Sequence, residues 1–334
     1  MKIKETIGID ISKLDFDVHI YSNQLHERFV NSTIGFKKMI KCVYKNSSFS
    51  KDEILFILEH TGLYSYQLSI FLSARNIPFT MVPGLAIKRS LGIARGKDDT
   101  IDAAKIALYG YRLRDELKPY KLPIQDVMII KRLLSLRVRL VKQRSGHKAT
   151  LKEQKRVLLK KDNMVLFETQ EKAIVFFSKQ IDKIQKEIQD IVNSNEQLKQ
   201  MYKLITSIKG VGSQTALFLI VYTNGFTKFN TARKFASYCG IAPFPNSSGT
   251  SVRGRTKVSH LANKKVKSLL DLCAKSSIQF NPEMKTYYDR RIEKGKNKMS
   301  TINIVRNKLL ARIFAVVERK TPYVDTLKYV AQAC

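Results

Sequence analysis

The stretch Lys97-Asp98-Asp99-Thr100-Ile101-Asp102-Ala103 lies where a turn-like segment at 94–97 gives way to an apolar helical pattern. We predict a helix here, capped by Asp98 or Asp99, because a short carboxylate accepts from otherwise unpaired amide N–H groups. Asp99 and Asp102 are three residues apart, so both project from one face of that helix. Two such carboxylates repel each other unless a cation lies between them, and oxygen-only ligation suits Mg²⁺ or Mn²⁺. The pair by itself is explained more simply as helix capping, so a metal site needs further acids.

The residues before this helix predict an α/β domain. Strand patterns cover 3–10, 16–21 and 25–30, and a short helix with one apolar face covers 35–44. The continuous apolar run at 54–58 is typical of a strand buried on both faces. A helix over 64–74 and a strand over 77–82, stopped by Pro83-Gly84, come next. Three antiparallel strands followed by helix, strand, helix, strand and helix is the order of the ribonuclease-H-like fold.

This order predicts that four acids distant in sequence converge. Asp10 ends the first strand, which is central in such a sheet, and Glu59 ends the neighbouring fourth strand. Asp99 and Asp102 lie on the last helix, and reactive groups of open sheets gather at strand ends. The set of four is much more specific than either pair within it.

Composition indicates a polyanionic partner. The chain has 334 residues, enough for two or three domains, and its 60 Lys and Arg against 28 Asp and Glu give a net charge of +32. Such an excess favours nucleic acid over a membrane surface, because neither a long apolar span nor a concentrated basic amphipathic helix is present. The N-terminus lacks a signal-peptide core, so we expect a cytoplasmic protein.

Cysteine usage argues for a hard metal, if one is bound. The four cysteines, at positions 42, 239, 273 and 334, are widely spaced and contain no Cys-x-x-Cys motif. This spacing argues against a thiolate zinc site and against a disulfide framework.

The middle of the chain predicts an antiparallel helical hairpin. A very basic helix is expected from 126 to about 160, a turn at 161–164, and a second long helix from 171 to 205. The second helix carries an apolar seam that polar Asn195 interrupts; the seam consists of Ile181, Ile184, Ile188, Ile191 and Leu198. The hairpin would serve as a spacer, an oligomerisation element or a nucleic-acid contact, or simply present a solvated lysine-rich face.

Beyond residue 205 the sequence favours contact with phosphates. Ile208-Lys209-Gly210-Val211-Gly212-Ser213 resembles a helix-hairpin-helix turn, whose N–H groups can hold a phosphate, although glycine turns between helices are common. Between Glu196 and Asp271 there is no acidic residue, while lysine and arginine recur throughout. Helices over 264–277, 284–294 and 301–317 complete the chain.

A loop is expected from Gly240 to Arg255, within the acid-free region. Ser247 and Ser248 lie there next to a glycine, with Arg253 and Arg255 close behind. Such serines can present a hydroxyl to a phosphodiester, although Ser-Ser-Gly is also ordinary turn sequence.

Taken together, the motifs resemble those of one known family. They occur in the order Gly8-Ile-Asp10-Ile-Ser-Lys13, Glu59-His-Thr-Gly62, residues 97–103, Ser247-Ser248-Gly249, Asn281-Pro282, Tyr287-Tyr288-Asp289-Arg290 and Lys294-Gly295-Lys296. From Ile7 to about Val317 the chain resembles the DEDD transposases of bacterial insertion sequences, which are bridge-RNA-guided recombinases.

The resemblance implies three parts. These are a RuvC-like metal-binding domain at 1–120, a helical coiled-coil linker at 121–203, and a mostly helical transposase domain at 204–334. Asp10, Glu59, Asp99 and Asp102 would bind Mg²⁺, and Ser248 would be the nucleophile, with Ser247 as the second choice. The family forms dimers that assemble into tetramers, and its non-coding RNA pairs with donor and target DNA. The expected location is the bacterial cytoplasm, at the nucleoid.

The sequence departs from the family pattern at two places. Asp98 stands where the family usually has Thr, and His260-Leu261-Ala262-Asn263 replaces the usual Lys-x-Gly-Asn. Phosphate contacts there would then come from Lys264 and Lys265, beside those expected from Lys209, Gly210, Gly212, Arg253 and Arg255.

The function predicted is cutting and rejoining of double-stranded DNA by Mg²⁺-assisted serine attack. The nearest alternative is a RuvC-like, Mg²⁺-dependent junction nuclease that uses the same acids and water. A second alternative is a non-catalytic nucleic-acid scaffold, in which the acids are caps and surface charge.

Overall fold

A computed structural model of the chain describes residues 2–60, 62–90, 99–248 and 252–324. The chain forms two compact units, residues 1–122 and 123–334, and each is described by itself. The division into three parts, with the hairpin as a separate linker, stays a prediction.

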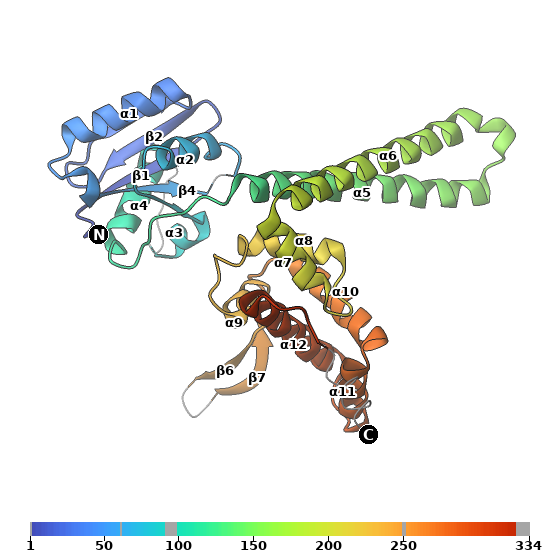
Figure 1. The fold of residues 1–334 in the computed structure, drawn as a ribbon. Helices are drawn as coiled ribbons and strands as arrows, with labels where there is room; N and C mark the ends of the chain where they lie inside the picture. The colour runs from blue at the N-terminus through green and yellow to red at the C-terminus, as the bar shows by residue number, and fades with distance from the viewer. Residues whose placement is uncertain (1, 61, 91–98, 249–251, 325–334) are drawn as a thin grey trace. The chain divides into compact units, whose positions relative to one another are not determined.

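The first unit is built on a mixed sheet whose central strand is β1 (Figure 1). Strands β1 (Glu5–Ile11), β2 (Asp15–Ile20) and β3 (His26–Val30) form an antiparallel meander. Strand β4 (Ile54–Glu59) runs parallel to β1, and β5 (Phe79–Val82) runs parallel to β4. The resulting order β3-β2-β1-β4-β5 confirms the predicted α/β, ribonuclease-H-like arrangement.

Helices cover both faces of this sheet. On one face, α1 (Thr33–Asn46) and α2 (Tyr66–Ser73) pack on the odd-numbered residues of β1, such as Ile7 and Ile9. On the other face, α4 (Asp99–Arg112) packs on Leu55 and Ile57 of β4. A 3₁₀ turn (Lys51–Glu53) leads into β4. Helix α3 (Gly84–Ser90) was not predicted, since its start coincides with the Pro-Gly pair that was interpreted as a stop.

Close contact between β1 and α4 depends on Gly8. A Cβ atom at this position would lie 2.9 Å from the Cα of Ala107 and would overlap the backbone oxygen of Ala103. Two residues earlier on β1, the Thr6 hydroxyl donates to the backbone carbonyl of Ala107 at 2.9 Å. Glycine therefore lets the helix backbone lie directly on the strand.

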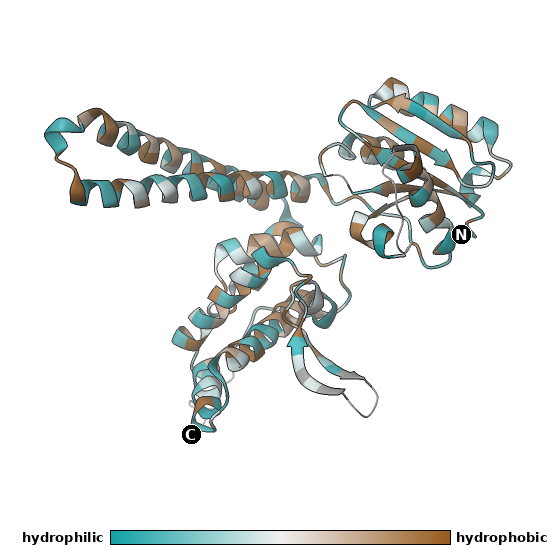
Figure 2. Ribbon diagram, turned by 180° about the vertical axis from the view of Figure 1, so that it is seen from behind, coloured by the Kyte–Doolittle hydropathy of each residue, from teal (hydrophilic) through white to brown (hydrophobic). Residues whose placement is uncertain are grey.

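The second unit is mostly helical. Helices α5 (Gln125–Val157) and α6 (Met164–Ser194) form the predicted hairpin, joined through a 3₁₀ turn (Lys160–Asp162). Brown, apolar segments recur along both long helices in Figure 2. Six further helices follow: α7 (Glu196–Thr206), α8 (Ser213–Thr223), α9 (Ala232–Tyr238), α10 (Lys264–Phe280), α11 (Pro282–Glu293) and α12 (Lys298–Arg319), counted within the described residues.

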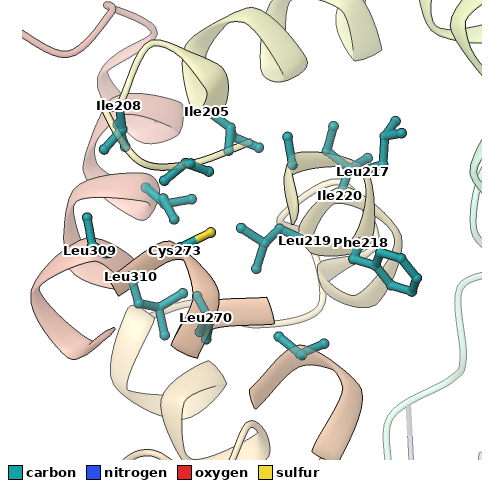
Figure 3. Close-up of a cluster of buried hydrophobic side chains, with 14 of the residues drawn as sticks. Ile205, Ile208, Leu217, Phe218, Leu219, Ile220, Leu270, Cys273, Leu309 and Leu310 are labelled. Atoms are coloured by element: carbon teal, nitrogen blue, oxygen red, sulfur yellow. The ribbon is translucent and has the colours of Figure 1, made fainter. Parts of the chain in front are cut away.

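The base of the hairpin and these helices share one hydrophobic cluster. Figure 3 shows its centre, where Leu219 of α8 lies toward Leu270 and Cys273 of α10 and toward Leu310 of α12. Ile130 of α5 belongs to the same cluster. Within the described residues, no helix is long and apolar enough to span a membrane.

The prediction of one helix from 171 to 205 was wrong, because the helix breaks at Asn195. The Asn195 side chain accepts from the backbone N–H of Leu198 at 3.1 Å and so caps α7. Its amide nitrogen also donates to Asp126 at 2.7 Å, which holds the break against the start of α5. Asparagine favours such a cap over a helix interior because its side chain replaces a backbone acceptor.

The expected loop at 240–255 was also wrong, since most of it forms a two-stranded antiparallel ribbon. Strand β6 (Pro243–Ser248) pairs with β7 (Val252–Val258), with a register shift between Phe244 and Asn246. Both strands of such a ribbon are edges, so Pro245 can sit where its missing N–H leaves no ladder bond unmade. Prolines and glycines therefore did not distinguish a loop from an edge-strand ribbon in this segment.

We predict that Gly8→Ala lowers the free energy of unfolding of the first unit by about 1–3 kcal/mol, the usual cost of overpacking a fixed backbone contact. The matched control is Gly146→Ala in α5, where an added Cβ meets nothing within 4 Å. That change should stabilise its helix by up to about 1 kcal/mol. Urea unfolding of both variants measures the difference, and equal effects would contradict the contact.

Candidate active site

Asp10 and Glu59 lie at the same edge of the sheet, on adjacent parallel strands. Ile9 pairs with Leu58 in the β1–β4 register, and the two acids each come one residue later. Because side chains alternate along a strand, Asp10 shares a face with Gly8, and Glu59 shares that face with Ile57. This is the face covered by α4. Both acids are partly exposed.

The first turn of α4 lies at the level of Asp10. Strand β1 and helix α4 run in opposite directions. Thr6 contacts Ala107, and Gly8, further along the strand, contacts both Ala107 and Ala103. A strand advances about 3.3 Å per residue and a helix about 1.5 Å. The two residues from Gly8 to Asp10 therefore match about four helical residues, from Ala103 back to Asp99. The backbone positions of all four predicted acids therefore lie toward one end of the sheet.

The two acids with described partners are held in different ways. Asp102 forms an ion pair with Lys105 one turn along α4, at 2.9 Å. The Glu59 carboxylate lies against Gly84, so closely that a Cβ there would overlap its Oε1 atom. Glycine at the start of α3 therefore leaves room for this side chain.

A fifth acid, which sequence analysis missed, lies beside Asp10. Asp17 of β2 is the register partner of Asp10 and is 6% exposed. Its Oδ1 atom lies 3.1 Å from Nε2 of His26 on β3. The signal was available in the alternating pattern of residues 16–21, because period two places Asp17 on the face opposite Phe16 and Val18.

The residues at this edge fit a divalent metal by their chemistry. Carboxylate oxygens are the ligands that Mg²⁺ and Mn²⁺ prefer, and Gly8 brings the helix near enough for both elements to contribute. Within the described side chains, no group of three or more Asp, Glu, His or Cys is arranged to hold a metal ion. The Asp98 residue and the Asp99 side chain, including the predicted cap, lie outside the described part, as does the segment 94–97.

In the second unit, the predicted serines are on the ribbon. Ser247 is paired with Arg253, and Ser248 with Val252, at the end of β6. The side chains of Ser247, Ser248, Arg253 and Arg255 lie outside the described residues. The backbone thus places both serines near the turn end of an exposed two-stranded arm.

The glycine turn between α7 and α8 is formed as predicted, and its first glycine has a packing role. Gly210 has φ +92°, and a Cβ there would lie 2.7 Å from the backbone nitrogen of Ser277 on α10. The Ser277 hydroxyl donates to the carbonyl of Lys209 at 2.9 Å. Gly212 precedes α8, and a Cβ there would meet nothing within 4 Å. Open space therefore exists at Gly212.

The two lysines after the ribbon differ in their surroundings. Both are exposed, and the Lys265 Nζ atom also lies 5.4 Å from the centre of the Phe218 ring. Asn263 caps α10 by accepting from Val266, and it donates to the hydroxyl of Tyr238 at 2.9 Å. Asn263 therefore has a structural role, as the N-cap of α10.

Two acids that follow the acid-free stretch, Asp271 and Glu283, are paired with cations. Burial alone would raise the pKa of Asp271, but hydrogen bonds from Lys275 and Arg306 lower it overall. Glu283 forms an ion pair with Arg312. Because these carboxylates are paired with cations, they add little repulsion toward a polyanion.

The two described thiols of this unit are poor candidates for a nucleophile. Cys239 is fully buried, and burial raises the pKa of its thiol to about 12. Cys273 is buried too, and burial raises its pKa. Since the thiolate is the reactive form, neither is suited to attack.

Nearly the whole chain is similar to known proteins. A family model described as "Transposase", of the IS110 DEDD type, matches residues 7–160. A second, described as "Transposase IS116/IS110/IS902 family", matches residues 202–289. The pilin gene-inverting protein of Moraxella bovis is 28% identical over 327 residues, covering 96% of this chain and 98% of that protein. An insertion element IS110 uncharacterized 43.6 kDa protein of Streptomyces coelicolor is 34% identical over 120 residues, covering 36% of this chain and 29% of that protein.

The fold of the first unit defines a ribonuclease-H-like domain, with Asp10 and Glu59 at one edge of its sheet. With both family models matching in order, the chain belongs to the DEDD transposase family of bacterial insertion sequences. It is therefore a DNA-processing enzyme of the transposase and recombinase class. Members of this family generally depend on divalent metal ions.

We predict that Gly210→Ala destabilises the helical unit by more than about 2 kcal/mol, because it combines a strained positive φ with overlap at Ser277. Gly212→Ala is the control and should cost about 1 kcal/mol or less, since its site is open. Urea unfolding measures both. A Gly210 variant as stable as the Gly212 variant would contradict the packing role.

Proposed function

We propose that this transposase cuts and rejoins DNA by attack of Ser248 on a phosphodiester, assisted by Mg²⁺ held by Asp10, Glu59, Asp99 and Asp102. The observation that carries the proposal is the register of β1, β4 and α4, in which Asp10, Glu59 and the first turn of α4 share one edge. Carboxylates gathered at one edge would repel each other unless a cation lay among them.

The bound ion would neutralise charge on the scissile phosphate. The Ser248 oxygen would bond to phosphorus while the bond from phosphorus to a deoxyribose oxygen breaks. The serine hydroxyl loses its proton, and the departing deoxyribose hydroxyl gains one. One phosphodiester is thus exchanged for another, so rejoining by the reverse step needs no external energy source.

Rejoining is favoured over hydrolysis by the likeness to the pilin gene-inverting protein, which extends over 98% of that protein. Inversion requires that each cut end be joined to a new partner. A covalent intermediate keeps the energy of the broken phosphodiester for that step, whereas hydrolysis loses it. The junction nuclease that uses the same acids with water remains the second candidate. Its support is that the acids belong to a unit without the serine ribbon.

Nucleic acid is contacted, in this proposal, by the acid-free part of the second unit. The contacts would come from Lys209, Gly210, Gly212, Arg253, Arg255, Lys264 and Lys265. Guidance by a non-coding RNA that pairs with both DNA partners, and assembly of dimers into tetramers, are supported by the family resemblance. RNA pairing would leave the protein to recognise backbone and shape, which suits its net charge of +32.

The test of the nucleophile is a covalent protein–DNA adduct. Element-end DNA, its flanking RNA and Mg²⁺ are incubated with the full chain and separated on a denaturing gel. We expect an adduct that is lost in Ser248→Ala and in Asp102→Asn and is kept in Ser247→Ala. Nicked DNA without an adduct, unaffected by the serine change, would support the nuclease instead. An adduct lost only in Ser247→Ala would move the role to that residue.

The test of the metal site uses the ion pair between Asp102 and Lys105. A metal bound by Asp102 must compete with Lys105, so Lys105→Met should lower the Mn²⁺ concentration for half-saturation roughly two- to fivefold, as expected for a partly exposed pair. Titration followed by electron paramagnetic resonance measures this. The matched control is Lys37→Met on α1, on the opposite face of the sheet. Identical affinities in the two variants would mean that Asp102 is not a ligand.

A further inference from the structure

An aromatic side chain is exposed on the serine ribbon. Phe244 of β6 is 42% exposed and lies between two exposed prolines, Pro243 and Pro245. Several other aromatic rings of this unit pack together, as Phe235 does with Phe229 and Phe314. Figure 1 shows the ribbon projecting from the helices of its unit, so burial within the unit does not explain Phe244.

The surroundings of Phe244 suit a polyanion. Lys257 is its register partner on β7, and the sequence carries no acid from 197 to 270. An aromatic ring next to a cation is the combination that binds unstacked bases and their phosphates. An acidic protein surface could match the charge alone. DNA matches both features, because its phosphates suit the lysine and its bases can stack on the ring.

Two prolines and a close approach of the strands restrict the backbone around Phe244. Proline fixes φ on either side of it. The register shift between Phe244 and Asn246 adds twist, as an irregularity of this kind does. Across the ribbon, a Cβ on Gly254 would lie 2.6 Å from the Asn246 side-chain nitrogen, so the strands are closely apposed. A stiff support lets an apolar side chain push between bases.

The distance to the proposed nucleophile is short. Phe244 and Ser248 are four residues apart on the same strand, which corresponds to about 13 Å of extended chain. One strand of DNA advances about 3.4 Å per nucleotide, so this spans about four base steps.

We propose that Phe244 is a wedge that enters the base stack of the DNA within a few base steps of the phosphodiester attacked by Ser248, while Lys257 holds an adjoining phosphate. This inference rests on the proposed function of the ribbon. Phe244 acts as a positioning residue: it unstacks the duplex so that the strand to be cut and exchanged is accessible.

The first experiment measures unstacking without chemistry. Complexes of Ser248→Ala with element-end DNA are probed with permanganate, which oxidises unstacked thymines. We expect reactive thymines within about six nucleotides of the scissile phosphate, and their loss when Phe244→Ala is added. The same pattern in both proteins would overturn the wedge, and this result does not depend on whether Ser248 is the nucleophile.

The second experiment asks whether DNA that is already open restores activity. Phe244→Ala should reduce adduct formation on paired DNA about tenfold or more, and a mismatch at the permanganate-reactive step should restore most of it. Phe280→Ala, which removes another exposed aromatic side chain at the end of α10, is the matched control and should have little effect. Equal loss on paired and mismatched DNA would overturn the proposal. A changed oligomeric state in light scattering would do so too, since Phe244 would then be part of a protein interface.

Discussion

Packing of α4 against β1 at Gly8 is the contact on which the candidate metal site depends. It sets the separation between the strand that carries Asp10 and the helix that carries Asp102, because the backbone of Ala103 lies where a side chain on Gly8 would be. The carboxylates are mutually repulsive, and such groups stay together only when a rigid frame holds them. Buried aliphatic residues on both faces of β4 supply that frame.

In the second unit, the proposed contact with nucleic acid depends on the overall charge distribution more than on the position of single groups. A long stretch without acids, internally paired Asp271 and Glu283, and a projecting ribbon are the features on which the proposed contact with phosphates rests. The large hydrophobic cluster around α8 and α10 keeps these helices fixed. A rigid, basic body with an exposed arm is suited to hold a duplex and act on one part of it.

Much of the first unit could be predicted because its patterns are local. The alternation of β2 and the continuous apolar run of β4 each indicate a strand, and the element order then defines the topology. Asp17 was missed because only the pairing of β1 with β2 brings it next to Asp10. Asn195 was interpreted as a polar interruption of a seam, although its capping role depends on Leu198 and on Asp126, far away in sequence. The ribbon was missed because its prolines lie on edges, where they are tolerated.

The central claim is that DNA is cut and rejoined through a covalent serine intermediate. The most direct measurement is the stereochemical course at a chiral phosphorothioate placed at the scissile position, read after complete recombination. Two successive in-line displacements, one by serine and one by the incoming strand, each invert the phosphorus, so the account predicts net retention. Net inversion would mean a single displacement and would contradict the account.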